Sequence, residues 1–331
     1  KSSVTNTSDE KYLTATRILD NLKSKLEATA LPTNYSWDVT KLDSSLEVRI
    51  KNASNKYITF ELIALDNKGN ESIEAITETV NTVAELPAQS TEGRKVQVIN
   101  TGSVDGSYWA IFKAEDGTSG KGYWEETVSP VVSPGLDATT MPHKLTNTDT
   151  DTFTFKQITW DTRQAGDDET NTHPSIVLES ETSPGTYVRK IQQTFFHNNR
   201  LGFLTGDNVC MSKSNSFYDF YFTSALTVVD SDPIDINCSS IKPAILHAII
   251  PTAQGLLLFS KNQQFLLFSD EQILTPATAV IRSISNYEMD SNIDPVNIGT
   301  EINFVSKTPS FTRIFSMQTL SPTENPIVVD I

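Results

Sequence analysis

A short alternation of apolar and polar runs recurs three times in the C-terminal half of the chain. Apolar runs that end in a hydroxyl residue occupy residues 201–205, 256–260 and 302–306. Each leads through a short polar turn into a second run rich in β-forming residues, at 209–211, 264–268 and 313–317. Such pairs of runs predict β-hairpins. Hairpins that recur roughly every 40–50 residues are typical of β-propeller blades, which stack because one blade cannot bury its apolar face alone.

A helical stripe opens the N-terminal half. Apolar residues recur at three- and four-residue steps from Tyr12 to Leu26, which predicts an amphipathic helix. Thr7 and Glu10 have the spacing of a capping box before the stripe, and Pro32 stops it. The apolar face of this helix has two alternative partners, its own domain or a neighbouring subunit.

Strand-like patterns follow the helix. Residues 46–50 alternate with period two, and residues 57–63 form a second run after a short stretch with two asparagines, as in a hairpin. Residues 95–99 and 108–112 predict another hairpin, and residues 77–86 predict a second helix that ends before a proline. Because helical and strand patterns are mixed, this half indicates an α+β domain.

The pattern changes in the middle of the chain. Residues 128–135 contain two prolines and a glycine, and residues 146–152 consist of Thr, Asn and Asp alone. Such segments serve as connections because they cannot pack a core. We therefore expect a mainly β protein, with an α+β domain at residues 1–145 and the first blades of a β-propeller at residues 146–331. Since the chain begins with Lys and ends in an apolar run, we expect the propeller to be incomplete in it.

Composition narrows the functional classes. The formal net charge is −15, so the chain has no excess of cations with which to hold nucleic-acid phosphates. This acidic balance fits a solvated surface, or the wall of a passage that DNA crosses without sticking. No run approaches the roughly 18 apolar residues of a membrane span. Cys210 and Cys238 lack metal-type spacing, which disfavours a disulfide framework and fits a reducing compartment.

No arrangement of reactive residues stands out. Carboxylates cluster at residues 167–169 and again at Asp230, Asp232 and Asp235. The first cluster lacks the ligand spacing of a calcium loop, and the Asp-Pro step in the second indicates a turn in which Asp caps the backbone. The four histidines have no metal-ligand spacing, and no nucleophile elbow or phosphate loop is present. We therefore expect no catalytic, cofactor-binding or metal-binding residues, and we expect Asp230→Ala to impair folding or assembly rather than chemistry.

Several short motifs occur in one order along the C-terminal two thirds of the chain. They read MPHKL at 141–145, WDTR and AGDD within 160–168, FFHNNRLGFL at 195–204 and DSDPID at 230–235. In this order they resemble the nozzle, or tail tubular B, family of short-tailed bacteriophages with podovirus morphology. Residues 171–174 depart from the family pattern, with an NTHP step in place of a shorter one. The N-terminal half resembles the family more loosely.

The resemblance implies a structural virion protein and not an enzyme. It implies a homo-hexameric ring that closes the tail tube, with a platform that docks on the tail adaptor ring and a propeller-like nozzle wall beside the tail fibres. DNA would pass through this ring during ejection without stable binding, and no cofactor is implied. The expected location is the virion tail, after assembly in the cytoplasm of the bacterial host.

The matched motifs supply candidates for residues that fix blade geometry or subunit contacts. These candidates are Trp160, Arg163, Asp167, Asp168, Asn199, Arg200, Asp230, Asp232 and Pro233. From residue type, the two arginines and the Asp230/Asp232 pair are expected to form ion pairs or caps.

Two alternative functions stay open, a virion-associated glycan hydrolase and a carbohydrate-binding propeller. A hydrolase needs two carboxylates in one cleft, from the set Asp167, Asp168, Asp230, Asp232 and Asp235. A binding module needs an exposed aromatic platform, for which the aromatic residues within 217–222 are candidates.

Overall fold

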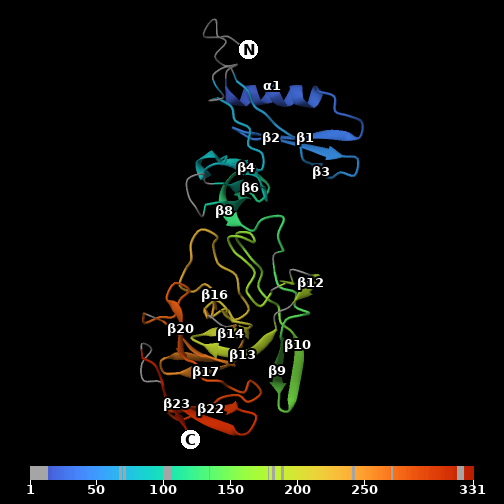
Figure 1. Cartoon of the computed structure of the whole chain (residues 1–331). Helices are drawn as coiled ribbons and strands as arrows, with labels where there is room; N and C mark the ends of the chain where they lie inside the picture. The colour runs from blue at the N-terminus through green and yellow to red at the C-terminus, as the bar shows by residue number, and fades with distance from the viewer. Residues whose placement is uncertain are drawn as a thin grey trace. The chain divides into compact units, whose positions relative to one another are not determined.

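The computed structural model describes residues 14–66, 69, 72–99, 106–133, 135–177, 179–180, 183–187, 190–240, 243–269, 271–318 and 324–331. The chain divides into two compact units, Lys1–Val131 (unit 1) and Val132–Ile331 (unit 2) (Figure 1). Strands dominate both units, which confirms the prediction of a mainly β protein. Among the described residues, no helix is long and apolar enough to cross a membrane.

One face of a small sheet in unit 1 carries the predicted helix, α1 (Ala15–Ala28). The sheet consists of β1 (Tyr35–Lys41), β2 (Leu46–Asn52) and β3 (Tyr57–Ile58) in sequential antiparallel order. The helix packs on β1, and within its apolar stripe Leu19 is buried while Leu22 and Leu26 are half-buried. Of the strand predicted at residues 57–63, only the first two residues adopt strand structure, as β3. The proposed capping box and Tyr12 lie outside the described residues.

The second sheet of unit 1 has five strands in the order β4-β6-β7-β8-β5. These are β4 (Thr79–Val80), β5 (Gln89–Thr91), β6 (Lys95–Val98), β7 (Tyr108–Ala114) and β8 (Ser119–Thr127). The predicted hairpin of β6 and β7 is confirmed. The helix predicted over residues 77–86 is wrong. Val80 is instead buried beside Val96 and Val98, which draws β4 into a parallel pair with β6 and leaves only the short 3₁₀ turn η2 (Val83–Glu85).

Unit 2 opens with a separate hairpin of β9 (His143–Asp149) and β10 (Thr152–Gln157). The expected domain boundary at residues 145 and 146 falls inside β9, whereas the division between the compact units precedes this hairpin. The short strands β11 (Glu179–Ser180) and β12 (Ser183–Tyr187) pair with one another.

Three four-stranded antiparallel sheets follow, and each is a simple up-and-down meander. The first contains β13 (Ile191–His197), β14 (Arg200–Thr205), β15 (Asn208–Met211) and β16 (Ile234–Asn237). The second contains β17 (Leu246–Thr252), β18 (Gly255–Ser260), β19 (Gln264–Ser269) and β20 (Ala279–Ser285). The third contains β21 (Val296–Ile298), β22 (Glu301–Lys307), β23 (Thr312–Gln318) and β24 (Ile327–Asp330). The three repeated hairpins predicted from the sequence form the two middle strands of these sheets.

The three sheets stack face to face. Leu256 and Leu258 of β18 belong to the core between the first and second sheets. Their neighbours Leu257 and Phe259 belong to the core between the second and third sheets. Because side chains alternate between the faces of a strand, the second sheet is buried on both sides. This double burial explains the unbroken apolar run of β18.

Candidate functional site

Most of the candidate residues lie on two loops that cover the free face of the first sheet. The loops span residues 158–177, before β13, and residues 212–233, between β15 and β16. Trp160 is buried in the core that these loops make with Phe203 of β14, and its ring lies 5.9 Å from that of Phe220. Trp160 therefore acts in packing and is not an exposed platform for a sugar.

Arg200, the first residue of β14, binds the second loop. The turn before it places Asn198 and Asn199 at φ angles of 47° and 56°, as a two-residue type I′ hairpin requires. Arg200 is only 1% exposed, and its guanidinium donates to main-chain carbonyls of the loop. Nη1 lies 2.8 Å from the oxygen of Ser212 and 2.5 Å from that of Asp232, and Nη2 lies 2.8 Å from that of Asp230.

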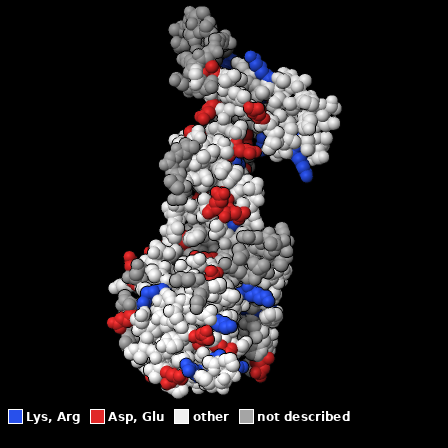
Figure 2. Space-filling view, viewed as in Figure 1, with Lys and Arg blue, Asp and Glu red and all other residues white. Residues whose placement is uncertain are grey.

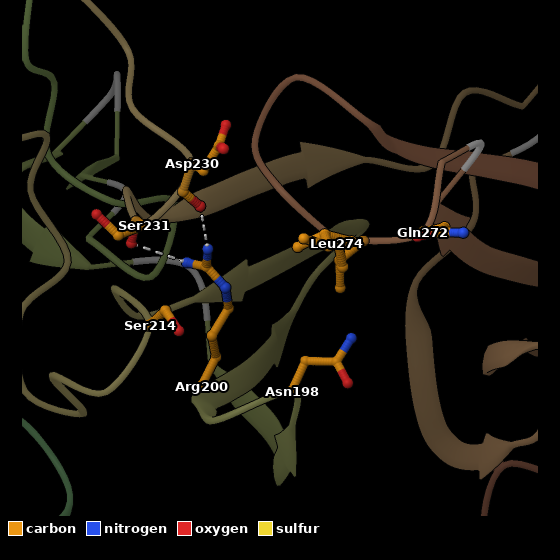
Figure 3. A pocket seen from close by; sticks show the side chains of 8 residues that line it. Asn198, Arg200, Ser214, Asp230, Ser231, Gln272 and Leu274 are labelled. Atoms are coloured by element: carbon orange, nitrogen blue, oxygen red, sulfur yellow. Dashed lines mark hydrogen bonds between the residues drawn. The ribbon is translucent and has the colours of Figure 1, made fainter.

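Ion pairs and caps were the two roles expected from residue type, and this arrangement corresponds to a cap. Arg200 holds the loop through carbonyl oxygens, and the contacts to Asp230 and Ser231 are visible in Figure 3. Burial lowers the pKa of Arg200, and the charge of Asp232 opposes that shift. Since arginine stays protonated in proteins, the site buries a cation whose charge is compensated mainly by peptide dipoles.

Asp232 stabilises the same loop from within. Its buried carboxylate accepts hydrogen bonds from the backbone nitrogen and the hydroxyl of Thr223 at 3.0 and 2.6 Å, and from the nitrogen of Val229 at 2.9 Å. Pro233, also buried, then leads into β16. Asp230 is exposed and contributes its carbonyl to Arg200, not its carboxylate. Asp232, and not Asp230, is therefore the side chain that the loop depends on.

The first loop has its own buried arginine. Arg163 donates from Nη1 to the exposed carboxylate of Asp168 at 2.8 Å, and its guanidinium lies 5.4 Å from the centre of the Tyr221 ring. Asp167 accepts from the backbone nitrogens of Glu169 and Thr170, which closes a local turn. The aspartates of the GDD motif thus have different tasks, one in an ion pair and one in a turn.

Sequence reasoning missed two residues that join the loops. Asn171 is fully buried, donates to the carbonyls of Ala165 and Phe222, and accepts from the nitrogen of Phe222. His173 contacts the hydroxyl of Tyr221 through Nδ1 at 2.8 Å. Both lie in the NTHP step that departs from the family pattern. The departure from the family pattern is therefore a sequence signal that points to these two residues, although it does not reveal their partners.

His173 gives the loops a pH dependence. Burial lowers its pKa below the usual 6.5, and Arg163 lowers it further while Asp168 opposes the shift. The unfolded chain therefore binds the proton more readily than the fold does. We expect the stability of unit 2 to decline as the pH falls from about 7 to about 5, and to decline less in His173→Gln. Thermal unfolding across this range checks the expectation; equal pH slopes in both proteins would contradict it.

Four of the five carboxylates considered for a glycan hydrolase have local partners of their own. Asp168 contacts Arg163, Asp167 closes its own turn and Asp232 is buried against Thr223. Asp235 accepts from the nitrogen and hydroxyl of Ser175. Among the described residues, no group of His, Cys, Asp and Glu has the geometry of a metal site.

A hollow of about 420 Å³ lies beside Arg200, between the β13–β14 turn and the loop that precedes β20. Of the carboxylates considered for a hydrolase, only Asp230 lines it (Figure 3). Cys210 and Cys238 are both buried and free.

Comparison with known proteins identifies the family to which the chain belongs. The profile of the bacteriophage nozzle protein family matches residues 2–331. The tail tubular protein gp12 of Escherichia phage T7 is 29% identical over 264 residues, an alignment that covers 78% of this chain and 31% of the relative. The chain thus spans about a third of the length of that relative. It belongs to the bacteriophage nozzle protein family.

Proposed function

We propose that the chain is a wall subunit of a phage tail nozzle and that it works by assembly, without chemistry. The observation that carries this proposal is the family match over almost the whole chain. The geometry supports it, because the candidate residues stabilise loops and cores. Averaged electron-microscopy density of the virion tail, with the stacked sheets of unit 2 as the search object, tests the assignment.

A tube wall requires several copies of the chain. A closed ring built from identical subunits has several copies side by side around its channel. From the family resemblance we propose a homo-hexameric ring that contacts the tail adaptor ring and the tail fibres. We place its assembly in the host cytoplasm. Residues 1–145 would supply the platform and residues 146–331 the nozzle wall.

We further infer that the three stacked sheets are successive blades of a β-propeller. Each has the four-stranded meander of a blade, and each packs on its neighbour through alternate side chains. The outer face of the third sheet carries apolar side chains, as do the faces that pack within the stack. Val296, Ile314 and Val329 lie on this outer face and are exposed. Another sheet covering this face would continue the stack.

The conduit must let DNA slide. Acidic residues outnumber basic ones by 41 to 26, and on the face of unit 2 shown in Figure 2 the basic side chains lie apart with acidic ones among them. We therefore propose that carboxylates equal or outnumber cations on the inner wall. Each phosphate contact would add affinity by releasing counterions and would slow the passage of DNA.

At moderate salt we expect the purified chain to bind duplex DNA no more tightly than about 10⁻⁴ M, the weak end of the non-specific range. The physical reason is the scarcity of cation clusters. A gel-shift or fluorescence-anisotropy titration over a salt series measures it. Tight binding that weakens steeply with salt would contradict this expectation, because it would show that the conduit binds DNA strongly.

The hydrolase alternative receives no support from the geometry. Its carboxylates are engaged in separate turns and ion pairs, and Asp230 alone faces the hollow. Assay of the chain on bacterial surface polysaccharide tests this alternative. Turnover that disappears in Asp230→Ala while the fold persists would establish an enzyme.

A further inference from the structure

The β9–β10 hairpin has two faces of opposite character. The strand register sets Leu145 opposite Phe155 and places Phe153 opposite Asn147 on the same face. Leu145, Phe153 and Phe155 are 63%, 59% and 69% exposed. With the ring of His143 stacked on Phe155 at 5.3 Å, they make a continuous apolar strip, which we call the hairpin strip.

The other face of the hairpin is polar and is largely exposed as well. Lys144 and Lys156 are directly opposite on that face, and the ammonium of Lys144 lies 5.7 Å from the centre of the Tyr218 ring. Tyr218 belongs to the loop of residues 212–233 that covers the first sheet. The hairpin therefore exposes lysines on one face and large apolar side chains on the other, where a solvated face of a sheet is usually polar.

Nothing within the described residues covers the hairpin strip. The two strands pair only with each other there, so the hairpin stands beside the stacked sheets and not within them (Figure 1). A two-stranded hairpin is marginally stable alone in water, and several exposed large apolar side chains on one face mark an interaction surface.

The charges on the hairpin strip face and on the whole chain bear on which partner the strip binds. The hairpin strip face, formed by residues 143, 145, 147, 153, 155 and 157, contains no Asp, Glu, Lys or Arg, so it offers nothing to nucleic-acid phosphates. The chain carries a net charge of −15, so two copies repel each other over most of their surfaces. A face without charged side chains can approach an acidic neighbouring copy without that repulsion, and the centres of protein interfaces are likewise depleted in charged residues.

We propose that the hairpin strip docks on a neighbouring copy of this chain in the assembled wall. The inference rests on the proposed multi-copy wall and adds the surface through which copies meet. Phe153 and Phe155 would be the anchoring side chains, because large aromatic residues at the centre of an interface carry most of its binding energy.

Sedimentation of the whole chain over a concentration series tests the strip. The double variant Phe153→Ser and Phe155→Ser is expected to raise the concentration for half-assembly at least about 100-fold, with its unfolding temperature retained. The matched control Thr154→Ala and Lys156→Ala alters the opposite face of the same strand and should shift it by less than about threefold. Assembly of the serine variant at wild-type concentrations would overturn the strip while leaving the nozzle assignment intact, and a wild-type chain that stays monomeric would overturn the strip as a contact between copies.

A photo-crosslinking residue at position 155, introduced during phage assembly, identifies the partner directly. The expected product contains two copies of this chain. A product that joins the chain to a different protein would overturn the proposal but not the nozzle assignment, which tail density tests independently. Absence of any product in complete virions would likewise overturn it.

Discussion

Replacing Arg200 with methionine should lower the free energy of unfolding of unit 2 by roughly 3–5 kcal/mol. The methionine keeps the apolar stem but leaves the carbonyl oxygens of Ser212, Asp230 and Asp232 without their donor. Two of these contacts lie in buried surroundings, where unsatisfied acceptors are costly. The loss should therefore exceed that of an ordinary surface substitution.

Chemical denaturation of the variant, with Asp230→Ala as a matched control, measures this effect. Asp230 contributes only its carbonyl to Arg200, so removal of its side chain should change stability by less than about 0.5 kcal/mol. This prediction differs from the expectation from the sequence, in which Asp230→Ala impairs folding or assembly. Equal losses in the two variants would show that the carbonyl contacts are not what holds the loop.

Substituting valine for Gly202 should cost about 3 kcal/mol and lower the unfolding temperature of unit 2 by several degrees. Gly202 pairs with Phe195 across β13 and β14, and the Phe195 ring occupies the space of the missing side chain. A Cβ atom at Gly202 would lie 2.1 Å from Cζ of Phe195, far inside van der Waals contact. Phe195 is buried in the core toward the second sheet and has little room to move.

A double-mutant cycle separates this clash from a general weakening of the strand. Phe195→Ala removes the obstructing ring, so adding Gly202→Val to it should cost much less than adding it to the wild type. Thermal unfolding of the four proteins gives the coupling energy. Additive losses would mean that Gly202 serves backbone flexibility and not the packing of Phe195.

The blade-like hairpins were predictable because the packing of their strands determines which sequence positions are apolar. Runs such as Leu256–Leu258 are unbroken because both faces of the second sheet are buried. Residues 77–86 were not predictable in this way. The short pairing of β4 with β6 depends on Val96 and Val98, which are distant in sequence, and that contact overrides a local helical pattern.

The candidate site was predictable in its residues but not in their contacts. The motifs identified Arg163, Arg200 and Asp232 as structurally important, and all three are buried. Residue type left both ion pairs and caps open for the two arginines. It did not show that Arg163 pairs with a carboxylate while Arg200 binds main-chain carbonyls, which no side-chain pattern records. The role of Asn171 was not predictable from the sequence, because this residue joins loops that meet only in the folded chain.

Reconstruction of the virion tail by electron microscopy tests the central claim most directly. If the chain is a wall subunit, the stacked sheets of unit 2 will fit the tail density at several equivalent positions around a continuous channel. The hairpin of β9 and β10 will then lie between adjacent copies. Density that places this chain away from the channel, or in a single copy per tail, would contradict the account.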